Sequence, residues 1–550
     1  MATERYEGRL ELTWTNKDRC LLAYEDGSYA WVNPSDYRVA EVRLLDDAGT
    51  VGDVHQPATR AADNLLIRGD ALNALASLTE LPEFAREYVG NVKVVYIDPP
   101  FNTQQSFLHY DDNLEHSVWL TMMRDRVVQL KKLLAPAGSI WVHCDDSEQA
   151  HLRVLMDEVF TAACFVATVI WRSTDNSNND AKQFSQDHNV ILVYSREPEW
   201  RSNGLPRSDA QARHYANPDA DPRGPWFDGN PVGSPNPREN LRYDIVSPTG
   251  HTIEPPDNGW RWKRETLEAK MATGEIRFSD DGTRIVRRTY LADQGVLPPS
   301  TLWFDIDETG SNRQAKYELK RLFRRPSADL FDTPKPERLM RRIIGLAANP
   351  GDIVLDCFLG SGTTAAVAHK MGRRWVGIER SASTLDDYAA PRLSRVVLGD
   401  DPGGISALVE WRGGGGFRVL DVAASMFEAD SGNVVIADWA SNGKLAETTA
   451  AQLGFEYEPD APFVGRRGRS RLAVVDGLVN PDVARILVDA LAESELLTLC
   501  GTAVDPATAP ALREMRRGSV VRKIPASILA EYRRPRWRSG QSTVTADPKA

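Results

Sequence analysis

Cysteine is scarce in this chain of 550 residues, which has five, and none of them forms a C-x-x-C pair or has histidine partners at zinc spacing. Free thiols in a reducing cytoplasm are therefore expected, and no metal site is predicted. A signal peptide and an apolar run long enough to span a membrane are also lacking, so no contact with a membrane is expected. The chain has no G-x-x-x-x-G-K-[ST] phosphate loop and no recognisable metal-nuclease cluster, which excludes ATP-driven translocation and DNA cleavage by this chain itself.

An excess of positive charge is lacking too. The net charge is −11, the wrong sign for a protein that coats nucleic acid, although local charge matters more than the sum. Basic residues gather at Arg287, Arg288, Lys316, Lys320, Arg321, Arg324 and Arg325. A DNA-contacting surface and a solvated charged face are the two interpretations of this group, and its position along the chain favours DNA.

The most informative stretch that is present runs from Val92 to Thr103. Residues 92–97 are almost continuously apolar, with Lys93 as the exception, and mostly β-branched, which predicts a strand of a parallel sheet buried on both faces. Pro99 and Pro100 end the strand, because proline cannot donate ladder hydrogen bonds and fixes φ. Asp98 is thus held at the carboxyl end of a strand, where open α/β sheets bind ligands.

A carboxylate, two prolines and an aromatic ring in succession suit methylation of an exocyclic amine on a nucleobase. The lone pair of such an amine is delocalised into the ring, so the amine needs fixed acceptors for its N–H bonds. Asp98 supplies one acceptor, the carbonyl of Pro99 a second, and Phe101 stacks on a base swung out of the helix. The alternative is a structural Asp-Pro-Pro turn.

A second stretch, 352–365 followed by 374–379, predicts a strand, a glycine turn, a helix start and another strand that ends in an acid. Gly360 and Gly362 allow close approach of a ligand, and Glu379 is placed to hold ribose hydroxyls. A nicotinamide dinucleotide site is the first rival, because Ala365 is compatible with its fingerprint. Two features favour S-adenosylmethionine instead. The chain lacks a second dinucleotide-binding feature, and the aromatic residue Phe358 precedes the glycine turn. The remaining candidates in this stretch are Asp356, Phe358 and Thr363.

With the catalytic stretch before the cofactor stretch, the chain resembles the DNA amino-methyltransferases in their permuted (β) arrangement. It is most similar to the modification (Mod) subunit of type III restriction systems. The resemblance covers most of residues 60–400 and also rests on 66–70, 138–146 and 331–336. It implies a Rossmann-like α/β methyltransferase core that uses S-adenosylmethionine.

The resemblance also implies roles for three further residues. Asp70 lies near the adenine of the cofactor in that family, although it is equally suited to cap the helix that follows. Thr333 and Lys335 are candidates to meet the carboxylate of the cofactor's methionine end. His143 lies within a predicted strand and is expected to be a core residue rather than a catalytic base.

The expected organisation is a core split by an insert and flanked at both ends. The predicted parts are an N-terminal β module (1–55), the catalytic half of the core (56–196), a target-recognition insert (197–330), the cofactor half (331–400) and a C-terminal α/β domain (401–550). Glycines 413–416 are expected to be a linker. Arginines 533, 534, 536 and 538 around Trp537 suggest a phosphate-contacting tail, with dimerisation or partner docking equally compatible.

The predicted function is transfer of a methyl group to adenine N6 in duplex DNA at a specific sequence, as the modification subunit of a restriction or phage-defence system. Cytosine N4 methylation and a non-catalytic DNA-binding specificity subunit are the alternatives. Cytosine C5 methylation is disfavoured, because it needs a nucleophilic cysteine, usually in a Pro-Cys pair, and the chain has no such pair. The expected partners are double-stranded DNA, a second copy of the chain and a helicase-nuclease subunit.

Overall fold

The computed structural model describes residues 10–23, 29–102, 105–106, 111–112, 115–229, 231–326, 330–441 and 444–532. The predicted arginine tail lies outside these residues. The chain forms two compact units. One comprises Met1–Arg201 and Ser300–Ala550, and the other comprises Ser202–Pro299.

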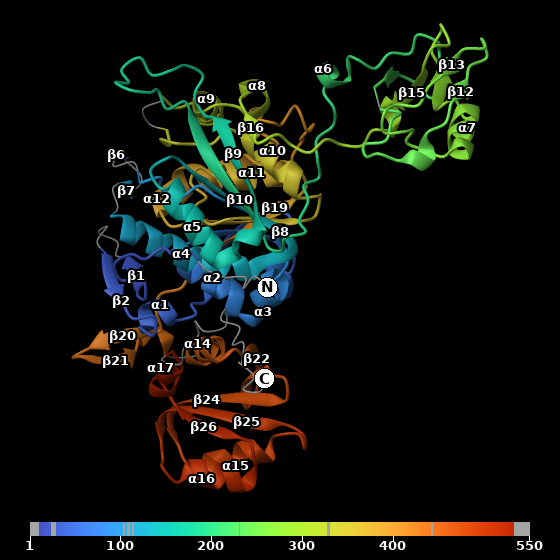
Figure 1. The fold of residues 1–550 in the computed structure, drawn as a ribbon. Coiled ribbons are helices and arrows are strands. Elements are labelled where there is room, and N and C mark those ends of the chain that lie inside the picture. The colour runs from blue at the N-terminus through green and yellow to red at the C-terminus, as the bar shows by residue number, and fades with distance from the viewer. Residues whose placement is uncertain are drawn as a thin grey trace. The chain divides into compact units, whose positions relative to one another are not determined.

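A ten-stranded sheet is the centre of the first unit (Figure 1). In spatial order its strands are β16 (Leu302–Trp303), β9 (Phe165–Arg172), β10 (His188–Ser195), β8 (Leu134–Cys144), β5 (Val92–Ile97), β17 (Ile353–Asp356), β18 (Arg374–Glu379), β4 (Asn64–Arg68), β19 (Gly416–Val422) and β3 (Leu45–Gly52). Strands β10 and β3 run opposite to the others. The α/β class predicted from the sequence is therefore confirmed.

The direction in which the chain moves across the sheet changes between β5 and β17. From β5 the chain continues to β8 on one side, and from β17 it continues to β18 on the other. The two strands are parallel neighbours, with Val95 beside Leu355. Ligands of open α/β sheets bind in the crevice at such a switch point, so the fold brings the two predicted motifs to one place.

Burial explains why these segments are strands. Val94, Val95, Tyr96 and Ile97 are all almost fully buried, as expected for a strand covered on both faces. The first face is covered by helices α2 (Ala71–Glu80), α3 (Pro82–Tyr88), α4 (His116–Leu133) and α5 (Gln149–Phe160). The second face is covered by α10 (Glu337–Ala347), α11 (Thr363–Lys370) and α13 (Ala390–Leu398).

The structure divides the N-terminal and C-terminal parts differently from the expected boundaries at 55 and 401. A two-stranded hairpin of β1 (Cys20–Ala23) and β2 (Tyr29–Val32) is present, but β3 belongs to the central sheet. Glycines 413–416 are not a linker between domains, because Gly416 begins β19, which pairs with both β4 and β3. A Cβ on Gly416 would meet backbone atoms of Val51 and Asp53 at 2.4–2.6 Å, so a close strand approach needs this glycine.

A five-stranded sheet lies in the region predicted to be a C-terminal α/β domain, within the first unit. Its strands are β22 (Glu456–Asp460), β23 (Phe463–Arg467), β24 (Ser470–Val479), β25 (Leu496–Val504) and β26 (Val520–Lys523), and its helices are α14 (Lys444–Leu453), α15 (Pro481–Asp489), α16 (Thr508–Met515) and α17 (Ala526–Tyr532). The side chain of Gln452 on α14 bonds the backbone of Val42 in both directions. The segment before β3 is therefore joined to this domain.

The second unit is smaller than the insert expected at 197–330. It contains β11 (Trp226–Asp228), β14 (Ile276–Phe278), β15 (Ile285–Tyr290), the pair β12 (Ile245–Val246) and β13 (Thr252–Ile253), and helices α6 (Asp209–Ala212) and α7 (Arg264–Ala272). Its core is formed around Trp260, Leu267 and Ile276. Strand β16 and helices α8 (Ile306–Thr309) and α9 (Asn312–Phe323) lie in the first unit instead, because β16 pairs with β9.

The remaining short elements of the described residues are α1 (Tyr37–Ala40), α12 (Ala382–Thr384) and the strand pairs β6 (Gln105–Ser106) with β7 (Asp111–Asp112) and β20 (Phe427–Asp430) with β21 (Asn433–Ile436). None of the helices among the described residues has the length and apolar character needed to cross a membrane.

Candidate active site

A cavity of about 1010 Å³ opens at the carboxyl ends of β5 and β17, within the first unit. Every site residue predicted from the sequence lines it except Gly362, which caps helix α11. The predicted residues that line the cavity are Asp70, Asp98, Pro99, Pro100, Phe101, Thr333, Lys335, Asp356, Phe358, Gly360, Thr363 and Glu379. Asp145 lines the cavity as well.

A hydrogen bond and a ring contact hold the diproline turn in place. Trp119 is fully buried on α4, and its indole N–H donates to the carbonyl of Pro100 at 2.7 Å. The ring of Phe101 stacks on that of His143, with 5.5 Å between centroids and 21° between planes. His143 is buried and bonds the Tyr96 hydroxyl through Nδ1 at 2.9 Å, and burial lowers its pKa well below the usual value. A neutral ring that supports Phe101 agrees with a core role for His143.

Asp98 has one occupied and one vacant oxygen. Its Oδ2 accepts from Lys335 Nζ at 2.5 Å. Its Oδ1 is buried and has no hydrogen-bond partner within the described parts of the chain. Burial raises the pKa of Asp98, and Lys335 only partly offsets that rise. A buried acceptor without a donor is costly, so this oxygen is a candidate to receive a ligand N–H.

Lys335, predicted to meet the carboxylate of the cofactor, lines the cavity and pairs with Asp98. Besides Asp98, its ammonium group lies 5.0 Å from the centroid of the Phe101 ring. Only 8% of the Lys335 side chain is exposed. The sequence could not show this pair, because the two residues are separated by the whole of the second unit and meet only through the adjacency of β5 and β17.

The glycine turn has the geometry that its sequence predicts. Gly360 and Gly362 have φ of +52° and +82°, a region that favours glycine. A Cβ on Gly360 would also approach the Phe331 ring at 3.1 Å. The two carboxylate oxygens of Glu379 accept backbone N–H bonds from Gly360 and Ser381, both at 2.8 Å. Glu379 thus shapes the turn as well as facing the cavity.

Asp356 is the most perturbed carboxyl of the site. It ends β17 and accepts from the backbone N–H of Phe358 at 2.9 Å and from the Thr364 hydroxyl at 2.6 Å. Burial raises its pKa to about 7 despite these bonds, and the charges of Asp98 and Glu379 add to the rise. Clustered carboxyls with raised pKa in a cleft are characteristic of functional sites.

Asp70 caps α2, as one of its two expected roles requires. Its Oδ1 accepts from Leu72 N at 2.8 Å, and its Oδ2 pairs with Arg126 at 2.9 Å. Burial raises the pKa of Asp70, but Arg126 and the Leu72 N–H outweigh burial, so the net shift is downward. Because Asp70 also lines the cavity, the capping role does not remove it from the ligand site.

The lining residues that the sequence reasoning did not single out include Tyr29, Arg126 and Arg380. Arg126 had a signal, since it sits on the same apolar face of α4 as the buried residues Met123 and Val127. A charged residue on such a face needs a partner or a ligand. Tyr29 gave no signal, because its position depends on how the N-terminal hairpin packs on the core.

The lining charges discriminate between the two cofactor hypotheses. Five acidic residues line the cavity, namely Asp70, Asp98, Asp145, Asp356 and Glu379, against the three basic residues Arg126, Lys335 and Arg380. An acidic lining suits the sulfonium and ammonium charges of S-adenosylmethionine. The pyrophosphate of a dinucleotide carries the opposite charge, so the lining argues against the nicotinamide rival.

The basic group expected to contact DNA proves to be heterogeneous. Arg288 is buried and pairs with Asp219 at 2.5 Å and Asp221 at 2.9 Å, and Arg287 pairs with Glu275 at 2.9 Å. Arg288 is thus buried within the second unit rather than on its surface, whereas the Arg287 side chain is paired and still 27% exposed. Their partners lie up to about seventy positions away, which no local pattern shows. Lys320, Arg321, Arg324 and Arg325 are exposed, on or just after α9.

Comparison with known proteins identifies similar chains. The chain is 30% identical over 440 residues to the "Probable type III restriction-modification enzyme HindVI Mod subunit" of Haemophilus influenzae, covering 69% of this chain and 56% of that protein. It is 30% identical over 387 residues to the StyLTI Mod subunit of Salmonella typhimurium, covering 61% and 57%. The chain thus spans little more than half the length of these relatives.

Among solved structures, the PvuII DNA methyltransferase (cytosine-N4-specific) matches with 16% identity and a TM-score of 0.34, covering 64% of this chain and 92% of that one. A family model described as "DNA methylase", for N6 and N4 methyltransferases, matches residues 92–390. That range begins with β5, contains both motifs and ends after the helix that follows Glu379, so it covers the switch point and its cavity. The chain belongs to this DNA methylase family, as its two motifs predict.

Proposed function

We propose that this chain transfers a methyl group from S-adenosylmethionine to the exocyclic amine of a base in duplex DNA, with adenine N6 as its target. The observation that carries the proposal is the vacant Oδ1 of Asp98, a buried acceptor in the wall of the cavity. An amine N–H of a flipped base satisfies it. Membership of the DNA methylase family supports the same chemistry.

The diproline turn completes the environment of the amine. The Pro100 carbonyl is already bonded by Trp119, which fixes the turn and leaves the Pro99 carbonyl as the proposed second acceptor. Two acceptors orient the nitrogen lone pair toward the methyl group. Because the pKa of Asp98 is raised, its carboxylate is also a better base for the proton that the nitrogen must lose.

The cofactor residues follow from the lining. Glu379 is proposed to accept from the ribose hydroxyls, Asp70 and Phe358 to lie at the adenine end, and the turn at Gly360 to approach the ligand closely. Gly362, Thr363 and Asp356 form the frame of that turn. Thr333 remains a candidate for the methionine carboxylate. Bound S-adenosylmethionine supplies an electrophilic methyl group and leaves as a neutral thioether.

Lys335 is proposed to contact both the catalytic carboxylate of Asp98 and the bound cofactor. Its Nζ already neutralises Oδ2 of Asp98, and it lines the cavity beside Thr333. A cofactor carboxylate within reach is proposed to bind this ammonium group as well.

Sequence specificity is proposed to reside in the unit Ser202–Pro299, and the chain is proposed to act as a dimer with a helicase-nuclease partner. The support is the inserted position of this unit between the two motifs and the likeness to proteins named type III Mod subunits. Replacing residues 202–299 by the corresponding unit of a relative is expected to change the methylated sequence while cofactor binding persists. Retention of the original sequence would place recognition elsewhere. Light scattering of the chain bound to DNA measures its oligomeric state, and a monomer would contradict the proposed dimer.

The chemistry is tested with S-adenosylmethionine carrying an isotopic label in its methyl group. Duplex DNA is incubated with the chain, digested to nucleosides and separated by mass. Label in N6-methyladenine supports the proposal, and label in N4-methylcytosine moves the target to the first alternative. Sequence-specific DNA binding without any label would leave the second alternative, a non-catalytic specificity subunit.

A further inference from the structure

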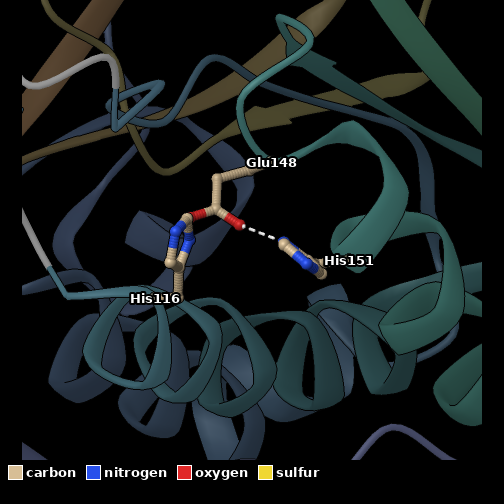
Figure 2. A group of neighbouring side chains, drawn as sticks. All are labelled: His116, Glu148 and His151. Carbon is tan, nitrogen blue, oxygen red and sulfur yellow. Dashed lines mark hydrogen bonds and ion pairs between the residues drawn. The ribbon is translucent and has the colours of Figure 1, made fainter.

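Two histidines and a glutamate converge where α4 and α5 begin (Figure 2). His116 is the first residue of α4, Glu148 precedes α5, and His151 lies in the first turn of α5. Glu148 Oε1 lies 2.5 Å from His116 Nδ1, and Oε2 lies 3.0 Å from His151 Nδ1. One carboxylate is therefore placed between two imidazole rings that come from different helices.

The burial of this carboxylate requires a compensating charge. The Glu148 side chain is 0% exposed, whereas those of His116 and His151 are 58% and 42% exposed. In the described parts of the chain its ion-pair partners are these two histidines, with no lysine or arginine. A buried carboxylate without a counter-charge is strongly destabilising. A cation bound between the two rings would supply this counter-charge.

The geometry points to a cation, and we propose that His116, Glu148 and His151 bind a late first-row divalent metal ion such as Zn²⁺. Metal–ligand bonds of about 2.0–2.2 Å place neighbouring N and O ligand atoms roughly 3.0–3.4 Å apart. The 3.0 Å separation between Glu148 and His151 fits such an ion, and the 2.5 Å separation between Glu148 and His116 must widen by roughly half an ångström or more to admit it. All candidate ligand atoms lie within 4.8 Å of one another. Two imidazoles select Zn²⁺, Co²⁺ or Ni²⁺ over Mg²⁺ and Ca²⁺, which prefer all-oxygen sites.

The exposed side chains show how the ion is reached and what completes its shell. Both imidazoles face solvent in part, so an ion enters from outside while Glu148 supplies the buried charge, and water fills the remaining positions. The starts of two helices carry partial positive charge that opposes a cation. Affinity is therefore expected in the micromolar range rather than that of a structural zinc site.

The site is joined to the catalytic turn through one side chain. Asn102 follows Phe101 directly, is buried, and donates from Nδ2 to Glu148 Oε1 at 2.7 Å. Its φ of +62° is unusual for a residue with a side chain, so the surroundings must hold it in place. The ligand Glu148 is thus also the anchor of the residue after the Asp-Pro-Pro-Phe motif. The ion has a positioning role: it holds Glu148, and Glu148 holds the turn.

The test is a titration of the untagged full chain, stripped by a chelator, with Zn²⁺ in a calorimeter and with Co²⁺ in a spectrophotometer. About one Zn²⁺ per chain and a Co²⁺ ligand-field spectrum are expected. His151→Ala and Glu148→Gln are each expected to weaken binding at least about tenfold. His251→Ala, which changes an exposed histidine of the other unit, is the matched control and is expected to bind as wild type does.

A second measurement guards against misfolded variants. His116→Ala removes a largely exposed ligand and leaves the bond between Asn102 and Glu148, so its melting temperature without metal is expected to match that of wild type. Zn²⁺ is expected to raise the melting temperature of wild type but not of His116→Ala. Absence of binding, or binding that persists equally in all three site variants, would show that protons alone balance Glu148 and would overturn the proposal.

Discussion

Two groups of buried carboxyls in the first unit behave in opposite ways. Asp98 and Asp356 line the cavity and have raised pKa values, chiefly because of burial. Glu337 and Asp401 are at least as buried but lie in an ion cluster with Lys370 and Arg392. The pKa of Asp401 is lowered, because Lys370 and Arg392 outweigh the effect of burial.

The difference lies in how much positive charge surrounds the oxygens. Asp356 is bonded on both oxygens, but its donors are a backbone N–H and a hydroxyl. Glu337 accepts from Lys370, from Arg392 at 2.9 Å and from the backbone N–H of Ile405 at 2.9 Å. Asp401 accepts from Lys370 at 2.6 Å and from Gly403 N at 3.1 Å. Asp98, by contrast, has one vacant buried oxygen. Burial alone therefore does not set the pKa of these carboxyls; the pKa is raised where cationic partners do not offset burial.

The largest effect on stability is expected in the ion cluster. Glu337→Gln removes a charge that balances buried Lys370 and Arg392, and it should destabilise the first unit by about 3–5 kcal/mol. Chemical unfolding followed by tryptophan fluorescence measures the loss. Glu80→Gln is the control, since it alters a partly exposed glutamate beside Lys132 and should change stability by less than about 1 kcal/mol. Equal effects for both variants would remove the distinction between the two kinds of carboxyl.

The stability contributed by the cavity carboxyl Asp356 is expected to depend on pH with a sign opposite to that of Asp401. The pKa of Asp356 rises from 3.8 to about 7 on folding, so between these values the folded chain binds the proton that the unfolded chain has released. The stability that Asp356 contributes is therefore present at acidic pH and is lost as pH rises from about 4 to 7. As pH rises from 5 to 8, the free energy of unfolding of Asp356→Asn should increase by about 2–4 kcal/mol relative to that of wild type. Parallel stability curves for the two proteins would contradict this assignment.

The smallest of these effects concerns the cofactor. Glu379→Ala is expected to weaken S-adenosylmethionine binding by about 1–3 kcal/mol, the cost of leaving ribose hydroxyls unpaired. Since Glu379 also holds Gly360 N and Ser381 N, Glu379→Gln is the better-matched change, because an amide still offers one acceptor to the turn. Calorimetry measures both, and affinity equal to wild type in both would show that Glu379 only shapes the backbone.

The features that the sequence predicted correctly depend on residues that are close together in the chain. Strand β5 and the glycine turn depend on local patterns of apolar residues, prolines and glycines, and the structure has them where they were expected. Twelve of the thirteen predicted site residues share one cavity because each motif ends a strand at the switch point.

The features that were missed depend on long-range packing. The pair between Lys335 and Asp98, the place of β19 between β4 and β3, and the buried pairs of Arg288 join segments far apart in the chain. The cluster of His116, Glu148 and His151 has the same origin, since α4 and α5 are separated by β8. No spacing within either helix indicates that these three side chains meet.

The central claim is that Asp98 orients the amine of a base and does not hold the cofactor. The most direct measurement compares Asp98→Ala with wild type in two assays, labelled-methyl transfer to duplex DNA and calorimetric binding of S-adenosylmethionine. Asp98→Asn is included to keep the side-chain volume beside Lys335, and Asp387→Asn, at an exposed position, is the control. We expect transfer to fall roughly a thousandfold in both Asp98 variants, while cofactor affinity stays within about threefold of wild type. Transfer by Asp98→Ala within about tenfold of wild type, or a loss of cofactor binding as large as the loss of transfer, would contradict the account.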